Sequence, residues 1–283
     1  MTAALKPQLT PRPFLKWAGG KGRLIEQYHA FFPKKIGRYH EPFLGGGAVF
    51  FHLSARCRQS VLADLNEELV NVYCCVRDDV ETLIDLLQIH QDRHCHDYYY
   101  TMRANGELRS PTRRAARLVY LNKTCFNGLY RENSKGHFNV PMGRYQKPKV
   151  CDAETLRHAS AALKQTDLTC AEFPSILDRA QSPEDFVYFD PPYHPISATS
   201  SFTRYNRYGF QAADQQRLQQ TFAQLAHRGV KVMLSNSDCP FIQDLYQDFY
   251  IHQIQASRAI NCKAKRRGKI SELVITSYPV LKK

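Results

Sequence analysis

Short apolar runs alternate along the chain with longer stretches in which apolar residues recur every three or four positions. A short apolar run bounded by turn residues is typical of a buried strand, and the longer period is typical of a helix with one buried face. The runs predict strands at 38–43, 60–65, 186–189, 230–235, 249–255 and 273–277. The longer period predicts helices at 21–32, 67–77, 80–91 and 214–228. Strands that alternate with helices predict an α/β fold with a largely parallel sheet.

The middle of the chain has a different pattern. Between about residue 67 and residue 164 it is first helical and then irregular, with few strand signals. Ser110 and Pro111 are typical of a helix start, because serine caps the first turn and proline fits the first helical position. The sequence therefore predicts a mainly helical module at 67–164, inserted into an α/β core made of residues 1–66 and 165–283.

Positive charge concentrates in the same region. The chain carries a formal net charge of +13. Residues 101–149 hold eleven lysines and arginines against two acidic residues, and a second basic cluster spans 263–269. A net charge can serve solubility alone, but a basic module of this kind is typical of nucleic-acid binding. We therefore expect a nucleic-acid partner.

Other features narrow the class of protein. No run approaches the roughly 20 apolar residues that a membrane-spanning helix needs, and the first 13 residues contain three prolines. The nine cysteines form no Cys-x-x-Cys pair, which argues against a disulfide framework or a zinc ribbon. The run His94-Cys95-His96 lacks a second ligand pair, so a polar loop is favoured over a metal site. We expect a cytoplasmic protein, with the nucleoid if bacterial, that needs no membrane, metal or obligate protein partner.

Asp190-Pro191-Pro192-Tyr193 directly follows the expected strand at 186–189. Open α/β sheets build their sites at the carboxyl ends of strands. An adenine amine is a poor nucleophile because its lone pair is delocalised into the ring. A carboxylate (Asp190) and a backbone carbonyl (Pro191) can accept both amine protons and stabilise the positive charge that develops as a methyl group arrives. Tyr193 offers a face for an extruded base, although the tetrapeptide alone also fits a rigid turn.

A glycine-rich turn predicts a ligand site near the first strand. Phe43 precedes this turn, and Gly45 and Gly47 let the backbone approach a ligand closely. Asp64 ends the next expected strand, where an acid can hold a ribose diol.

Residues 14–21 form a third candidate segment. It contains Trp17, the chain's only tryptophan, and a Gly-Lys pair that ends at Lys21. The pair lacks the glycine spacing of a phosphate-binding P-loop. Trp17 fits a core position or the wall of a cofactor pocket equally well.

These blocks, in this order, resemble the Dam group of DNA adenine-N6 methyltransferases from Phe14 to Tyr278. The matching segments are LKWAGGK at 15–21, EPFLGGGAVF at 41–50, ADLN at 63–66, LNKTCFNGLYR at 121–131, FNVPMGRY at 138–145 and DPPYHPISATSSFT at 190–203. The resemblance implies a Rossmann-like methyltransferase core with a mixed, mostly parallel sheet and an inserted, mainly helical DNA-recognition domain. It also implies S-adenosyl-L-methionine as the cofactor, double-stranded DNA as the partner, and adenine N6 within GATC as the target.

The resemblance assigns roles to single residues. The residues expected to bind the cofactor are Trp17, Lys21, Phe43, Gly45, Gly47, Asp64 and Asp190. Those expected to act in catalysis are Asp190, Pro191, Pro192 and Tyr193. Those expected to contact DNA are Lys16, Phe126, Asn127, Leu129, Arg131, Pro141 and Arg144. An arginine suits base reading because it can grip both major-groove acceptors of a guanine, and Phe126 can wedge into the stack although it has no hydroxyl to donate. The glycine turn, with three glycines before Ala48, departs mildly from the commoner Gly-x-Gly-Ser form.

The residues leave some alternatives open. Methylation at cytosine C5 needs a cysteine nucleophile, usually in a Pro-Cys pair, and the chain has no Pro-Cys pair. Methylation of a cytosine amine or of RNA would use a similar acidic loop, although the module at 67–164 favours duplex DNA. An inactive DNA-binding relative is disfavoured because Asp190, Asp64 and Lys21 are all present. We expect direct methyl transfer to an extruded adenine, without a covalent enzyme intermediate.

Overall fold

The structure is a computed structural model that describes residues 10–106, 108–196, 209–257 and 269–280. The chain divides into two compact units. The first unit comprises Met1–Lys21, Gly45–Ala55 and Asn66–Leu168, and the second comprises Gly22–Leu44, Arg56–Leu65 and Thr169–Lys283. Each unit is therefore assembled from three separate stretches of sequence.

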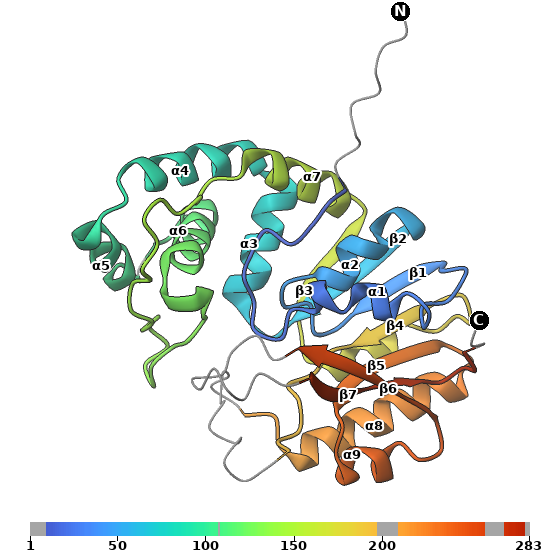
Figure 1. Cartoon of the computed structure of the whole chain (residues 1–283). Coiled ribbons are helices and arrows are strands. Elements are labelled where there is room, and N and C mark those ends of the chain that lie inside the picture. Colours follow the sequence, from blue (N-terminus) through green and yellow to red (C-terminus); the bar gives the residue numbers. More distant parts are fainter. Residues whose placement is uncertain (1–9, 107, 197–208, 258–268, 281–283) are drawn as a thin grey trace, which may run out of the picture. The chain divides into compact units, whose positions relative to one another are not determined.

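The described residues form a seven-stranded sheet in the order β3-β2-β1-β4-β5-β7-β6 (Figure 1). The strands are β1 Arg38–Glu41, β2 Gln59–Asp64, β3 Thr166–Cys170, β4 Phe186–Phe189, β5 Lys231–Ser237, β6 Tyr250–Ser257 and β7 Lys269–Thr276. β1 pairs in parallel with β2 and β4, and β4 pairs in parallel with β5. β7 runs antiparallel to both β5 and β6. The expected Rossmann-like core with a mixed, mostly parallel sheet is confirmed.

β4, the middle strand of the sheet, is short and apolar, as is typical of a strand that is covered on both faces. All four residues of β4 are buried. In register, β4 residue Phe189 lies opposite Leu234 of β5. This pairing places the residues that follow β4 beside the carboxyl half of β5, and the site described below depends on it.

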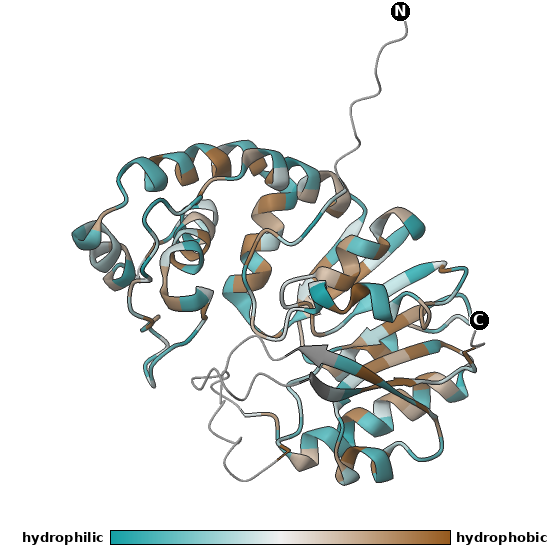
Figure 2. Cartoon of the chain, in the orientation of Figure 1, coloured by the Kyte–Doolittle hydropathy of each residue, from teal (hydrophilic) through white to brown (hydrophobic). Residues whose placement is uncertain are grey.

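The second unit packs helices and short turns on this sheet. They are α1 Ile25–Tyr28, η4 Phe173–Asp178, α8 Ala212–His227 and α9 Pro240–Leu245. α8 starts with a capping box in which Gln211 and Asp214 satisfy each other's backbone N–H groups. Its buried face carries Leu218, Phe222 and Leu225, which belong to the same apolar cluster as the strands. Figure 2 shows hydrophobic residues on β5 and hydrophilic residues on β1.

The first unit is mainly helical. It contains η1 Lys21–Arg23 at its boundary, α2 Ala48–Leu53, η2 Ser54–Arg56 at its boundary, α3 Glu67–Asp78, α4 Val80–Asp92, α5 His96–Ala104, α6 Pro111–Thr124, η3 Phe126–Gly128 and α7 Ala153–Leu163. α6 packs against α3, α4 and α5. As expected, Ser110 caps α6 and Pro111 occupies its first turn. The assignment of DNA recognition to residues 67–164 stays a prediction, and the first unit extends beyond that range.

Several elements differ from the expected ones for local reasons. The helix expected at 21–32 is wrong in extent, because η1 and the four-residue α1 replace it, and Leu24 supplies no side-chain cap. The strand expected at 38–43 ends before Pro42, which has no N–H to donate to a ladder. β3 was not expected, because its sequence TDLTC alternates without an apolar run. The basic cluster at 263–269 lies outside the described residues, apart from the backbone of Lys269.

Within the described part of the chain, no helix is both long enough and apolar enough to cross a bilayer. The run His94-Cys95-His96 lies in the first unit, and its residues make hydrogen bonds within the protein. Cys95 caps α5 by accepting the backbone N–H of Tyr98, and His94 hydrogen bonds to the hydroxyl of Tyr120 at 2.9 Å.

Histidine and tyrosine side chains join α4, α5 and α6. His90 on α4 is 9% exposed and stacks on Tyr120 of α6, with ring centroids 5.1 Å apart. Its Nδ1 lies 2.7 Å from the hydroxyl of Tyr98 on α5. Burial lowers the pKa of His90 to about 4. The folded protein therefore holds His90 neutral.

Acid should destabilise the first unit through His90. The unfolded chain takes up a proton near the ordinary pKa of 6.5, whereas the folded chain resists protonation down to about pH 4. This contribution to stability is complete above pH 6.5 and is lost as the pH falls towards 4, at up to about 1.4 kcal/mol per pH unit. Urea unfolding at several pH values in this window measures it.

The matched control is His96, which is exposed at the start of α5. His90→Gln should flatten the pH dependence of the free energy of unfolding, and His96→Gln should leave it as in the wild type. Equal slopes for the two variants would contradict this role of His90.

Candidate active site and nucleic-acid interface

Asp190 lies at the carboxyl end of β4 and is partly buried. The register of β4 with β5 brings it beside Ser235, whose hydroxyl donates to Asp190 Oδ1 at 2.9 Å. The hydroxyl of Tyr188 lies 2.9 Å from Ser235 Oγ. Because the single proton of Ser235 goes to Asp190, Tyr188 is the donor to Ser235. Two hydroxyl groups in series therefore hold one oxygen of the carboxylate.

The electrostatics keep the tyrosines around this carboxylate neutral. Burial, reinforced by the charge of Asp190, raises the pKa of the Tyr188 phenol well above its ordinary value. Burial and the neighbouring carboxylates, including Asp190 and Glu272, raise the pKa of Tyr193 in the same way. Tyr193 donates its proton to Glu272 Oε2 at 2.9 Å. Tyr188 and Tyr193 therefore act as hydrogen-bond donors, and neither adds a negative charge.

Phe43 and Asp64 lie at the same carboxyl edge of the sheet in the second unit. Phe43 is partly exposed and stacks on Phe173 of η4, with centroids 5.5 Å apart and an interplanar angle of 25°. Asp64 is the last residue of β2 and is also partly exposed. Its backbone carbonyl accepts the N–H of Ala171 at 3.3 Å, which joins the ends of β2 and β3.

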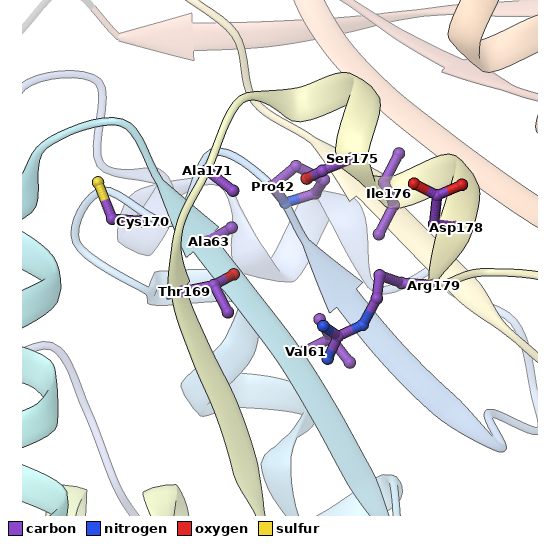
Figure 3. A pocket seen from close by; sticks show the side chains of 10 residues that line it. All are labelled: Pro42, Val61, Ala63, Thr169, Cys170, Ala171, Ser175, Ile176, Asp178 and Arg179. Atoms are coloured by element: carbon purple, nitrogen blue, oxygen red, sulfur yellow. The ribbon is translucent and has the colours of Figure 1, made fainter.

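A cavity of about 390 Å³ adjoins these residues in the second unit (Figure 3). Its lining comes from the ends of β1, β2 and β3 and from η4: Pro42, Val61, Ala63, Thr169, Cys170, Ala171, Ser175, Ile176, Asp178 and Arg179. None of the residues expected to bind the cofactor lines it. Phe43 and Asp64 each directly follow a lining residue in the sequence.

Trp17, Gly45 and Gly47 lie together in the first unit. A Cβ atom at Gly45, whose φ is +48°, would come within 3.0 Å of Trp17 Cδ1. Tyr73 donates its hydroxyl proton to the Gly45 carbonyl at 3.0 Å. The indole also stacks on Tyr130, with ring centroids 5.2 Å apart. Trp17 is thus a partly exposed wall beside the glycine turn, and Gly47 begins α2 in the left-handed conformation.

The seven residues expected to contact DNA all belong to the first unit. All except the partly buried Leu129 are exposed: Lys16, Phe126, Asn127, Arg131, Pro141 and Arg144. Phe126 is 49% exposed and is one of five large hydrophobic side chains that lie exposed among the described residues. Asn127 next to it is the only described non-glycine residue with positive φ, at +56°. The loop therefore holds an aromatic ring out in solvent at the expense of backbone strain.

A buried amide joins the segments that carry these residues. Asn122 is 1% exposed at the end of α6. Its Oδ1 accepts the N–H of Lys16 at 2.9 Å, and its Nδ2 donates to the carbonyls of Lys16 at 2.7 Å and Gly128 at 3.1 Å. The N–H of Phe126 donates to the Pro141 carbonyl at 2.9 Å. The structure therefore brings Lys16, Phe126 and Pro141 to one region.

Two further contacts orient charged side chains there. Arg131 donates from Nε to Asn139 Oδ1 at 2.7 Å. Lys16 Nζ lies 3.1 Å from the Tyr145 hydroxyl and 4.4 Å from the centre of its ring. Burial, and then the charge of Lys16, lowers the pKa of Lys123 nearby. Positive charges are thus crowded on this unit, which favours an anionic partner.

Sequence reasoning missed the residues that hold the Asp190 loop. Ser235 and Asn236 follow the apolar run of β5, and polar residues at a strand's carboxyl end are a usable signal for a site. Gln215 and Glu272 carry no such signal, because α8 and β7 bring them to the loop from distant parts of the sequence.

The chain matches the family described as D12 class N6 adenine-specific DNA methyltransferases over residues 17–260. It is 43% identical over 285 residues to the Type II methyltransferase M1.LlaDCHI of Lactococcus lactis subsp. cremoris. This alignment covers 98% of the present chain and 99% of the relative. It is 42% identical over 287 residues to the Type II methyltransferase M.MjaIII of Methanocaldococcus jannaschii, covering 94% and 99%. It is 34% identical over 271 residues to the DNA adenine methylase of Escherichia coli strain K12, covering 95% and 96%.

A Rossmann-like sheet with an Asp-Pro-Pro-Tyr loop at a central strand end therefore belongs to a methyltransferase. The match spans most of the chain, and the protein belongs to the D12 class of N6 adenine-specific DNA methyltransferases. It is an S-adenosylmethionine-dependent enzyme that acts on DNA. The expected family, enzyme class and cofactor are confirmed.

The residues present fit this cofactor in their chemistry. The first unit offers the Trp17 ring, the Gly45 turn and Lys21, which is 5% exposed and donates to the Gly19 carbonyl at 2.7 Å. A buried ammonium suits the cofactor's carboxylate. The second unit offers Asp64 for a ribose diol and Phe43 as a flat apolar surface. These assignments of single residues stay predictions.

A side chain at Gly128 should disrupt the expected DNA-contacting region. Gly128 has a φ of +64°, and a Cβ atom there would lie 2.5 Å from Lys16 Cδ and 2.6 Å from Lys16 Cβ. Gly128→Ala should therefore lower stability by about 1–3 kcal/mol and weaken DNA binding, because Lys16 must move. Urea unfolding and fluorescence anisotropy with labelled DNA measure the two effects.

Gly106→Ala is the matched control, since no atom lies within 4 Å of a Cβ at that position. It should bind DNA as the wild type does. Wild-type DNA affinity in Gly128→Ala would show that the position of Lys16 is immaterial to binding.

Proposed function

We propose that the loop at 190–193 holds the N6 amine of an adenine extruded from duplex DNA, and that the target sequence is GATC. The observation that carries this proposal is the position of the Asp190 carboxylate at the end of β4. One of its oxygens is held by the hydroxyl of Ser235 on β5. A carboxylate anchored in this way keeps its acceptor position fixed before the substrate arrives, which is what a charge-stabilising group requires.

The chain's residues act on the amine in two ways. Asp190 and the backbone carbonyl of Pro191 accept its two protons, which draws the nitrogen lone pair out of the ring. The negative carboxylate then stabilises the cationic amine as transfer proceeds, and it can accept the proton that the amine releases. When bound, S-adenosylmethionine supplies a methyl group on a positively charged sulfur, so that the N–C bond forms as the S–C bond breaks and a neutral thioether leaves.

The first unit is suited to duplex DNA. The exposed ring of Phe126 can enter the space that an extruded base leaves, and Tyr193 offers a face to the extruded base. Crowded positive charge around Lys16 and Lys123 supports contacts to phosphates. We propose that the inserted module at 67–164 provides this recognition, with residues 1–66 and 165–283 as the catalytic domain.

GATC follows from the resemblance to the Dam group, and the exposed Arg131 supports it. Asn139 orients the Arg131 guanidinium, which gives the arginine the fixed direction that base reading needs. Methylation of RNA or of a cytosine amine is the second candidate, because the loop chemistry is the same for any exocyclic amine.

Asp190→Ala should remove methyl transfer while leaving DNA affinity largely intact. The variant loses both the acceptor for the amine and the charge that stabilises it, and we expect the single-turnover rate to fall by at least about 10²–10³-fold. Rapid quench with methyl-labelled cofactor measures the rate, and anisotropy measures DNA affinity. Asp248→Ala, at an exposed acid of the same unit, should keep the wild-type rate.

Turnover near the wild-type level in Asp190→Ala would overturn the proposed role of the loop. A loss of DNA affinity equal to the loss of rate would instead make Asp190 part of the binding surface.

Duplexes that contain GATC should receive label on adenine, and duplexes with the same bases in another order should not. Arg131→Ala should lower the free-energy discrimination against a wrong base at one base pair by about 1–3 kcal/mol, because the variant loses a base contact. Digestion of the labelled DNA to nucleosides identifies the modified base. A uniform loss across all sequences would make Arg131 a phosphate contact, and label on RNA or cytosine would favour the second candidate.

A further inference from the structure

Two buried side-chain amides lie behind the loop at 190–194 in the second unit. Gln215 on α8 and Asn236 on β5 are both 0% exposed. Gln215 Nε2 donates to the Pro192 carbonyl at 3.0 Å. Asn236 Nδ2 donates to Gln215 Oε1 at 3.0 Å, and Asn236 Oδ1 accepts the N–H of His194 at 3.1 Å. The four groups form one continuous chain of hydrogen bonds.

The direction of every bond in this chain is fixed. A proline carbonyl can only accept, so Gln215 must present its NH₂ group to Pro192 and its oxygen to Asn236. Asn236 must then present its NH₂ group to Gln215 and its oxygen to the His194 N–H. Its oxygen also accepts the N–H of Ser237 at 2.8 Å. Neither amide can rotate by 180° without breaking bonds to buried partners.

The chain holds both peptide groups that flank Tyr193. Gln215 hydrogen bonds to the carbonyl of Pro192 before Tyr193, and Asn236 hydrogen bonds to the N–H of His194 after it. The Ser237 hydroxyl also donates to the His194 carbonyl at 2.7 Å. The backbone after Asp190 is therefore tied to β5 and α8, separately from the bond by which Ser235 holds the Asp190 side chain.

We infer that Gln215 and Asn236 are positioning residues for methyl transfer, which set the backbone of the loop through the Pro192 carbonyl and the His194 N–H. This inference rests on the proposed function of the loop. Neither side chain need touch the adenine or the cofactor. Their role is to keep the acceptors at Asp190 and Pro191 at their places, because a displacement of about 1 Å can lower a rate by about 10²-fold.

Gln215→Glu tests this role through the pH profile. The carboxyl has nearly the shape of the amide, but only its protonated form can donate to the Pro192 carbonyl while it accepts from Asn236. Burial raises the pKa of such a carboxyl above its ordinary range. The single-turnover rate should therefore be about 10- to 100-fold below wild type in alkaline buffer and should recover as the pH falls towards about 6. DNA and cofactor affinities should stay near wild type.

Gln216→Glu is the matched control, because Gln216 neighbours Gln215 on α8 and is exposed. It should show the wild-type pH profile. Gln215→Met separates positioning from packing, since methionine fills similar space without an amide. We expect Gln215→Met to be slow at every pH, with thermal stability measured alongside. If Gln215→Glu does not fold, Gln215→Met and Asn236→Asp decide the question. The single-turnover rate of Asn236→Asp should then recover at acidic pH, as expected for Gln215→Glu.

A wild-type rate in folded Gln215→Met, or a wild-type pH profile in folded Gln215→Glu, would overturn the inference. Asp190→Ala, measured in parallel, separates this failure from failure of the proposed function. An inactive Asp190→Ala with an active Gln215→Met removes only the positioning role, whereas an active Asp190→Ala removes the role of the loop itself.

Discussion

The hydrogen bond from Ser235 to Asp190 is the interaction on which the site depends. It exists because β4 and β5 pair in a register that places Phe189 opposite Leu234. The next residues, Asp190 and Ser235, therefore lie beside each other. A slip of one residue would turn Ser235 to the other face and leave the carboxylate without this donor.

Both units use buried side-chain amides to hold the backbone of a loop. Asn122 ties the Lys16 and Gly128 backbones in the first unit, and Asn236 with Gln215 ties the loop after Asp190 in the second. An amide suits this task because it donates and accepts at once and carries no charge to be neutralised. The two loops are thereby fixed by groups whose protonation does not change with pH.

The sequence made part of this site predictable. The Asp190 loop and the exposed Phe126 segment lie within continuous motifs, so their residue types and spacing were readable directly. Ser235 ended an expected strand, but its bond to Asp190 requires the register of β4 with β5, which no local pattern contains. Gln215 and Glu272 come from α8 and β7, and only the tertiary fold brings them to the loop. β3 was missed because an edge strand with partly exposed residues has no apolar run.

The most direct measurement is a structure of the enzyme with a GATC duplex and an unreactive analogue of the cofactor. The adenine should be extruded, with its N6 within hydrogen-bond distance of the Asp190 carboxylate and the Pro191 carbonyl, and Ser235 should still donate to Asp190. An extruded adenine whose N6 meets other groups, or an Asp190 carboxylate turned towards a different partner, would contradict the proposed chemistry.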